Sequence, residues 1–232
     1  MYLLTETASP FALERWAAFF ANFGQFAKGF FYTLGISIGA LIVALLLGLI
    51  FGDMSSTHNK VLRGISRVYV EIFQNTPLLV QFVVVFYGIS ILTDGHVMIP
   101  ISLTAILCVG VYTGAYISEI IRTGIEAVPK GQTEAALSQG FTYADTMRII
   151  ILPQAVRTIL PPLTNQVVNL IKNTSTVAII SGADIMFTAK AWAYDTTNYV
   201  PAFAGAAFLY FIMCFPLATW ARRKEEENKK AY

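Results

Sequence analysis

A row of amide and hydroxyl side chains lies in an otherwise apolar stretch of the second half of the chain. Spacings of four, four and three residues place its members on one face of a helix: Asn165, Asn169, Asn173 and Thr176. Lys172 and Gln166 flank the row. Polar side chains inside a membrane are costly, so they are functional candidates that could hydrogen-bond an amide or carboxylate of a solute. The alternative is that these amides join neighbouring helices by hydrogen bonds.

Prolines near these polar groups predict breaks in the helices that carry them. Pro161 and Pro162 precede the row, and we expect a broken backbone with freed carbonyls there. A second polar interruption combines Asn75, Thr76 and Pro77 with Gln81. Transporters commonly build substrate sites beside broken helices, so both interruptions are candidate parts of a substrate path.

The chain lacks the residue sets that catalysis or metal binding needs. His58 and His96 lie in different polar breaks, and Cys108 and Cys214 lie in separate apolar stretches. No Gly-x-x-x-x-Gly-Lys-Ser/Thr phosphate loop is present. We therefore expect no metal, no cofactor in this chain and no enzyme activity of its own.

Composition points to a chain whose solvent is largely lipid. Of 232 residues, 56% are hydrophobic and 13% charged, with a mean hydropathy of +0.60. An ordinary soluble domain is about 25% charged. The composition excludes a disordered chain and most soluble enzymes, and a net charge of +2 is too small to imply a nucleic-acid partner.

Apolar stretches without acidic or basic residues predict five membrane-spanning helices and an all-α fold. A span needs about 20 apolar residues. The fourth stretch qualifies only if Lys172 is tolerated inside the membrane. The stretches are residues 29–52, 72–93, 97–118, 158–183 and 196–221.

The basic residues predict the orientation of these spans, because Lys and Arg are enriched in cytoplasmic segments. Only Arg15, Lys28 and Lys190 fall on the opposite side. We expect an outer N-terminus and a cytoplasmic C-terminus. The basic residues assigned to the cytoplasm are Lys60, Arg63, Arg67, Arg122, Lys130, Arg148, Arg157, Arg222, Arg223, Lys224, Lys229 and Lys230.

The expected organisation has three parts. Residues 1–28 form an outer segment, in which residues 10–28 are either an interfacial amphipathic helix or an extension of the first span. Residues 29–222 form the five-span domain, with a cytoplasmic segment at 123–157, and residues 223–232 form a charged tail.

Glycine pairs four residues apart let helices approach closely. We interpret them as packing contacts. They are Gly35/Gly39, Gly48/Gly52 and Gly110/Gly114.

The cytoplasmic segment predicts two short helices set across a glycine. Residues 132–139 contain good helix formers, and Gly140 follows as a cap. Residues 141–152 predict a second helix that ends at Pro153. The result is a compact knob that either docks on another protein or stands alone as a surface hairpin.

The residues of this knob resemble the signature of ABC-importer permeases. Glu134-Ala135-Ala136, Gly140, Ile150 and Leu152-Pro153 match the pattern Glu-Ala-Ala-x3-Gly-x9-Ile-x-Leu-Pro in full. Further motifs resemble the polar amino-acid branch of that family. They lie at residues 69–81, 115–122, 128–132, 152–155, 160–162 and 172–175, the last reading Lys-Asn-Thr-Ser.

The resemblance implies a type I importer permease whose knob is a coupling helix seated on a separate ATPase. The coupling residues it implies are Gly131, Glu134, Ala135, Ala136, Gly140 and Pro153. Together with the polar interruptions, it implies a substrate path lined by Thr76, Gln81, Asn169, Lys172, Asn173, Thr174, Ser175 and Thr176.

The partners implied are two ATP-binding subunits that hold ATP and Mg, an outer solute-binding protein and a second permease, identical or paralogous. The expected place is the inner (cytoplasmic) membrane, among lipid. Some permeases for basic amino acids have an acidic residue where this chain has Asn173, which favours a neutral or acidic polar amino acid such as Gln, Glu, Asn or Asp.

Two alternatives stay open: an importer of basic or other polar amino acids, or a gradient-driven secondary transporter. The latter needs a carboxylate or histidine relay at mid-membrane, whereas Glu71 and Glu119 lie near span ends. We expect Glu119 to form an ion pair with Arg122.

Overall fold

The computed structural model describes residues 9–57 and 59–230, and every element in this part of the chain is helical. Of the expected outer segment and tail, residues 1–8 and 231–232 lie outside the described residues, as does His58. In chain order the elements are α1 (Leu13–Ala21), α2 (Phe23–Ser56), α3 (Lys60–Asn75), α4 (Leu78–Val83), the π-helix η1 (Val84–Gly88), α5 (Ile89–Leu92), α6 (Ile101–Glu126), α7 (Lys130–Ser138), α8 (Tyr143–Asp145), the π-helix η2 (Thr146–Ile151), α9 (Leu152–Asn173), the 3-10 helix η3 (Thr174–Ile180), α10 (Ile185–Thr196) and α11 (Tyr199–Lys230).

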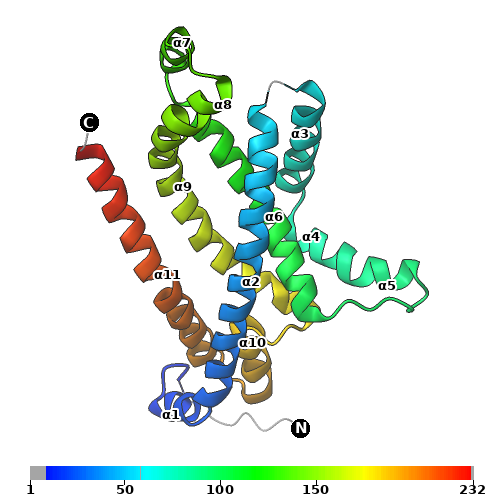
Figure 1. The fold of residues 1–232 in the computed structure, drawn as a ribbon. Coiled ribbons are helices and arrows are strands. Elements are labelled where there is room, and N and C mark those ends of the chain that lie inside the picture. The colour runs from blue at the N-terminus through cyan, green and yellow to red at the C-terminus, as the bar shows by residue number, and fades with distance from the viewer. Residues whose placement is uncertain (1–8, 58, 231–232) are drawn as a thin grey trace.

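Small residues bring α2 and α6 together along most of their length (Figure 1). A Cβ atom on Gly52 would lie 2.8 Å from Cβ of Ile121, and one on Gly110 would lie 2.7 Å from Cβ of Val43. The pairs Gly48/Gly52 and Gly110/Gly114 are therefore packing contacts, as predicted. Gly35 differs, because a Cβ there would meet no atom within 4 Å.

A second buried cluster joins the N-terminal end of α2 to α1, α10 and α11. Phe19 of α1 packs edge-to-face on Phe26 of α2 and Trp192 of α10, with ring centroids 4.8 and 6.0 Å apart. α1 ends before Asn22, and α2 begins at Phe23. Residues 13–21 therefore form a helix of their own, and residues 23–28 extend the first span.

By length and hydropathy, three described helices could cross a membrane: α2, α6 and residues Tyr199–Glu227 of α11. The predicted second span is not straight. α3 and the run α4–η1–α5 meet at 100°, and together they would count as a fourth span. The predicted fourth stretch corresponds to α9 and η3, in which polar residues are interspersed. The count of five spans stays a prediction.

The segments expected in the cytoplasm gather at one end of the molecule. Figure 1 shows the α2–α3 turn, α7, α8 and the C-terminal end of α11 at the top, with α1 and α10 at the bottom. The run α4–η1–α5 projects sideways from the bundle. The helices thus separate a basic end from an end with few basic residues.

The break predicted at Pro161–Pro162 is absent, because α9 runs without interruption from Leu152 to Asn173. Proline's fixed φ is itself helical, and each proline removes only one backbone donor. The discontinuity comes later, where α9 tightens into η3 and ends at Ser181 in the left-handed region (φ 61°).

Pro153 likewise does not end a helix. The π-helical turn η2 leads directly into α9, with Pro153 in the first turn of α9. Proline's fixed φ is helical, so Pro153 removes one backbone donor without ending the helix. The predicted second helix therefore merges with the following span.

Candidate functional site

The bend between α3 and α4 is held by side chains predicted to line the path. Pro77 has no backbone N–H, so it leaves the carbonyl of Phe73 without its helical partner. Nε2 of Gln81 donates to that carbonyl (3.2 Å), to the carbonyl of Thr76 (3.1 Å) and to Oγ1 of Thr76 (2.8 Å). Thr76 and Gln81 therefore stabilise the bend.

The polar row on α9 faces out of the subunit. Asn165, Asn169 and Lys172 are exposed, whereas Asn173 and Thr176 are half-buried. Nδ2 of Asn169 donates to Oε1 of Gln166 at 3.4 Å, which is a long contact within the same helix. These amides therefore do not join α9 to another helix of this subunit among the described contacts.

Hydroxyls at the junction of α9 and η3 bond to their own backbone. Oγ1 of the buried Thr174 donates to the carbonyl of Ile171 (2.7 Å), and Oγ of Ser175 donates to that of Lys172 (2.8 Å). These bonds satisfy carbonyls freed where the helix tightens. Thr174 and Ser175 thus shape the backbone at this junction.

The two discontinuities meet, because α4 packs against η3. Leu78 and Phe82 of α4 belong to the same buried cluster as Val177 and Ile180 of η3. The structure therefore brings the bend at Thr76–Pro77 and the end of α9 into one region. Broken helices that meet inside a bundle are typical of transporter substrate sites.

Asp184 is a buried carboxylate that the sequence reasoning missed. Its oxygens accept from the backbone N–H of Phe187 (3.0 Å) and Met186 (3.2 Å) and from the hydroxyl of Tyr210 (3.2 Å). The neighbouring N–H of Ile185 donates to Oγ1 of Thr33 (3.1 Å). Asp184 therefore caps α10 and ties it to α11, beside α2. An aspartate immediately before an apolar helix is the sequence signal for such a cap.

The knob has the turn that the sequence predicts. α7 ends in a Schellman motif: Gly140 has φ +87°, its N–H donates to Leu137 O (3.0 Å), and the N–H of Phe141 donates to Ala136 O (3.2 Å). Glu134 and Ala135 are exposed.

Ala136, which the resemblance places on the docking surface together with Glu134 and Ala135, is buried within the subunit. Its side chain is 3% exposed, because α7 packs against η2 on that side. Gly131 is exposed in the first turn of α7, and Pro153 follows η2. Two exposed apolar residues were missed: Leu137 (47% exposed) and Phe141 (38%) lie beside the knob's turn.

The comparisons with known proteins decide the family. Residues 44–225 match the family described as the binding-protein-dependent transport system inner membrane component. The chain belongs to this family of permeases. It is thus a multi-pass component of an inner-membrane transport system, and permeases of this kind work with an ATPase and a binding protein.

Curated relatives cover nearly the whole permease. A probable glutamine ABC transporter permease protein, GlnM of Bacillus subtilis, is 37% identical over 216 residues, which are 92% of this chain and 97% of the relative. The glutamate/aspartate import permease protein GltJ of Escherichia coli K12 is 33% identical over 208 residues, or 82% and 85% of the two chains.

Solved structures share the permease's fold. A crystal structure of an amino acid ABC transporter with histidines superposes with a TM-score of 0.84 at 31% identity, over 91% of this chain and 98% of that one. An inward-facing MetNI methionine ABC transporter superposes with a TM-score of 0.69 at 17% identity, over 88% and 98%, and supports the fold alone. The all-α type I importer fold is confirmed.

The ion pair predicted at the end of α6 is present in the permease. Arg122 contacts Glu119 with two guanidinium nitrogens, and its Nη1 lies 2.5 Å from Oε2 of Glu126. On α3, Nε of Arg67 lies 2.7 Å from Oε1 of Glu71. These pairs sit at the basic end of the molecule, away from the polar row on α9.

Proposed function

We propose that this permease is the membrane subunit of an ATP-driven importer of neutral or acidic polar amino acids, with glutamine and glutamate as the first candidates. The observation that carries the proposal is the exposed row Asn165, Asn169 and Lys172 on α9. Elsewhere the exposed faces of long helices such as α2 are apolar, with Leu46 and Leu49 as examples. A polar face on a membrane helix must meet water or polar groups, and a path between two permeases supplies both.

The chemistry of this face supports a polar solute with an amide or carboxylate. Lys172 offers a cation to a carboxylate, and the amides of Asn169 and Asn173 can both donate and accept. No carboxylate belongs to the row, so a cationic side chain would find no counter-charge there. The relatives named for glutamine and for glutamate/aspartate agree with this choice.

The knob is the proposed contact with the ATPase. Glu134 offers a carboxylate, while Ala135 allows close approach and Leu137 and Phe141 add apolar area. Exposed apolar side chains on a segment outside the membrane indicate a protein partner. The shape of this segment depends on Gly131, Gly140 and Pro153. The buried side chain of Ala136 lies where α7 packs against η2. ATP and Mg are held by the ATPase, an outer binding protein delivers the solute, and movement of two knobs opens and closes the path.

Uptake into vesicles tests the proposal. The permease is reconstituted with its ATPase and binding protein, the vesicles are loaded with ATP, and no ion gradient is applied. We expect accumulation of radiolabelled glutamine or glutamate, competed by asparagine or aspartate but not by arginine or lysine. ATP-dependent uptake of arginine would contradict the proposed substrate class. Uptake driven by an ion gradient through the permease alone would contradict the proposal of an ATP-driven importer.

A further inference from the structure

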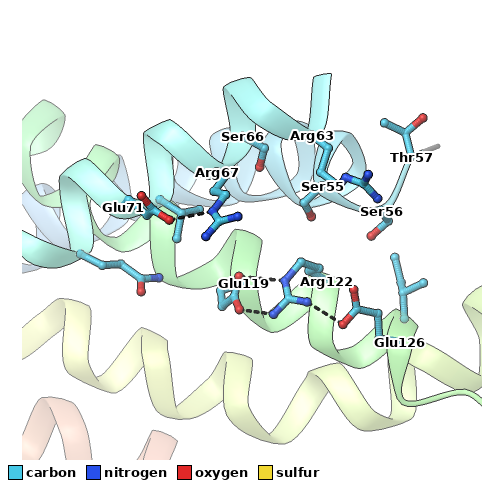
Figure 2. A pocket seen from close by; sticks show the side chains of 13 residues that line it. Ser55, Ser56, Thr57, Arg63, Ser66, Arg67, Glu71, Glu119, Arg122 and Glu126 are labelled. Carbon is cyan, nitrogen blue, oxygen red and sulfur yellow. Dashed lines mark hydrogen bonds and ion pairs between the residues drawn. The ribbon is translucent and has the colours of Figure 1, made fainter. Parts of the chain in front are cut away.

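A charged cleft lies at the basic end of the molecule, between α2, α3 and α6. It has a volume of about 560 Å³. Figure 2 shows side chains of α3 on one side and of α6 on the other, with hydroxyls of α2 near the rim. Its charged lining residues are Arg63, Arg67, Glu71, Glu119, Arg122 and Glu126.

Hydrogen bonds to both neighbouring helices hold α3 in place, so the cleft is preformed. Oγ of Ser66 donates to the carbonyl of Phe51 on α2 (2.7 Å). On the side of α6, Oη of Tyr69 donates to the carbonyl of Val111 (2.6 Å), and Nε2 of Gln74 donates to that of Ala115 (3.2 Å). Tyr69 and Ser66 are buried, which makes these anchors hard to loosen.

The charges of the cleft are complementary across it but paired only within each helix. Arg67 pairs with Glu71 on α3, and Arg122 pairs with Glu119 and Glu126 on α6. Among the described residues no ion pair bridges the two helices, and Arg63 has no acidic partner. In Figure 2 the guanidinium of Arg67 points toward the Glu119–Arg122 pair. The α3 wall therefore carries two guanidinium groups and one carboxylate, and the α6 wall carries two carboxylates and one guanidinium group, so the two walls have opposite net charges.

The cleft opens to water rather than to the hydrocarbon of the bilayer. α3 is amphipathic, and three of its four charged residues, Arg63, Arg67 and Glu71, line the cleft. The exposed apolar residues of α3 recur at intervals of four, three and four residues on the other side of the helix: Val61, Ile65, Val68 and Ile72. A ligand of this cleft must therefore arrive from the aqueous phase.

We propose that this cleft binds a free zwitterionic amino acid on the cytoplasmic side, with its carboxylate on Arg63 and Arg67 and its ammonium on Glu119 and Glu126. A purely anionic ligand would meet three carboxylates, and a purely cationic one would meet three guanidinium groups. Only a molecule with both charges matches both walls, and charge-assisted hydrogen bonds supply its affinity. This site is separate from the polar row on α9, and its existence does not depend on which solute the permease carries.

Binding of radiolabelled glycine, the smallest such zwitterion, tests the site directly. The full-length permease is placed in phosphatidylglycerol nanodiscs, with unlabelled L-glutamine, acetate, methylammonium and phosphoethanolamine as competitors. We expect saturable binding that L-glutamine displaces and that acetate or methylammonium alone does not. Stronger displacement by phosphoethanolamine than by glycine would overturn the assignment in favour of a lipid headgroup.

Variants locate the binding. The double variant Arg63→Gln/Arg67→Gln should weaken glycine binding by about tenfold or more. Lys60→Gln removes a charge from the same helix outside the cleft and should leave binding unchanged, as should Asn169→Ala on α9. If the double variant does not fold, Glu126→Gln tests the opposite wall. The proposal would be contradicted by an absence of saturable binding, by binding that the cleft variants leave unchanged, or by loss of binding in Asn169→Ala. Uptake is a separate measurement, so failure of the proposed transport function would be distinguishable from failure of this binding site.

Discussion

A single amide side chain, that of Gln81, satisfies the backbone where the chain turns by 100° between α3 and α4. The type of this residue suggested a lining role, because a glutamine within an apolar stretch has no other evident partner in the sequence. The structure supplies the partners, namely carbonyls released at Pro77. A side chain's partner depends on how the backbone bends, and the spacing of residues cannot show that.

Gln81→Ala should therefore reduce stability before it affects the choice of solute. Loss of the amide leaves the carbonyl of Phe73 unsatisfied in an apolar region, at a cost of about 1–3 kcal/mol. Thermal unfolding can be followed by a thiol-reactive dye that reports exposure of the buried Cys108, in a Cys214→Ala background. Gln25→Ala, at an exposed site of α2, is the control. Equal unfolding temperatures for the two variants would contradict the role of Gln81.

Asp184 gives a second test at this scale. Asp184→Ala removes the cap of α10 and the acceptor of Tyr210, and should cost about 1–2 kcal/mol. Asp184→Asn keeps an oxygen that can accept from the first turn, so its loss should be smaller. The same thiol assay ranks the two variants, and the reverse order would show that the carboxylate is not a cap.

Between elements, the decisive contacts are those of α2 with α6. Their glycines were recognisable in the sequence because small residues at a spacing of four have one common use in membrane helices. Which glycine packs was not recognisable: Gly39 lies against Ile106 and the pair Gly48/Gly52 against Ile117 and Ile121, whereas Gly35 has no atom within 4 Å of an added Cβ. Gly35 and Gly39 share one face of α2, and only one of them packs, so the position of the partner helix along α2 decides.

Gly52→Leu should separate α2 from α6. A Cβ at Gly52 would come within 2.8 Å of Ile121, so a larger side chain overpacks the contact and should cost about 1–3 kcal/mol. Gly35→Leu is the matched control in the same helix and should be neutral or slightly stabilising, since Leu favours helices by about 1 kcal/mol over Gly. Comparable destabilisation by both variants would argue against this packing.

The helix boundaries show what could be predicted from the sequence and what could not. The knob and its cap at Gly140 follow from local chemistry, since a left-handed turn favours glycine. The uninterrupted α9 and the bend after α3 do not. Pro161 and Pro162 are tolerated inside a helix, whereas Pro77 marks a sharp turn. Proline shows where a backbone donor is missing, and tertiary packing decides whether the helix bends there.

At the scale of the whole molecule, the proposed docking of the ATPase on the knob is coupled to opening and closing of the path. Glu134→Lys should lower the affinity of the permease for its ATPase by about tenfold or more, because reversing one charge of an interface pair leaves the other unpaired. Glu14→Lys makes the same change on α1 at the opposite end of the molecule and should have no effect. Retention of the ATPase during purification measures both. Full retention with Glu134→Lys would remove Glu134 from the contact.

In the assembled importer, the exposed face of α9 is proposed to meet a water-filled path. Asn169 and Leu46 are both exposed in the isolated subunit. Each is replaced in turn, as Asn169→Cys or Leu46→Cys, in a background without the native thiols (Cys108→Ala and Cys214→Ala). Labelling of the assembled importer by a membrane-impermeant thiol reagent compares them. We predict that Asn169→Cys reacts and that glutamine or glutamate slows its reaction, while Leu46→Cys, facing lipid, does not react. If Asn169→Cys is as unreactive as Leu46→Cys, this face of α9 does not line a water-filled path.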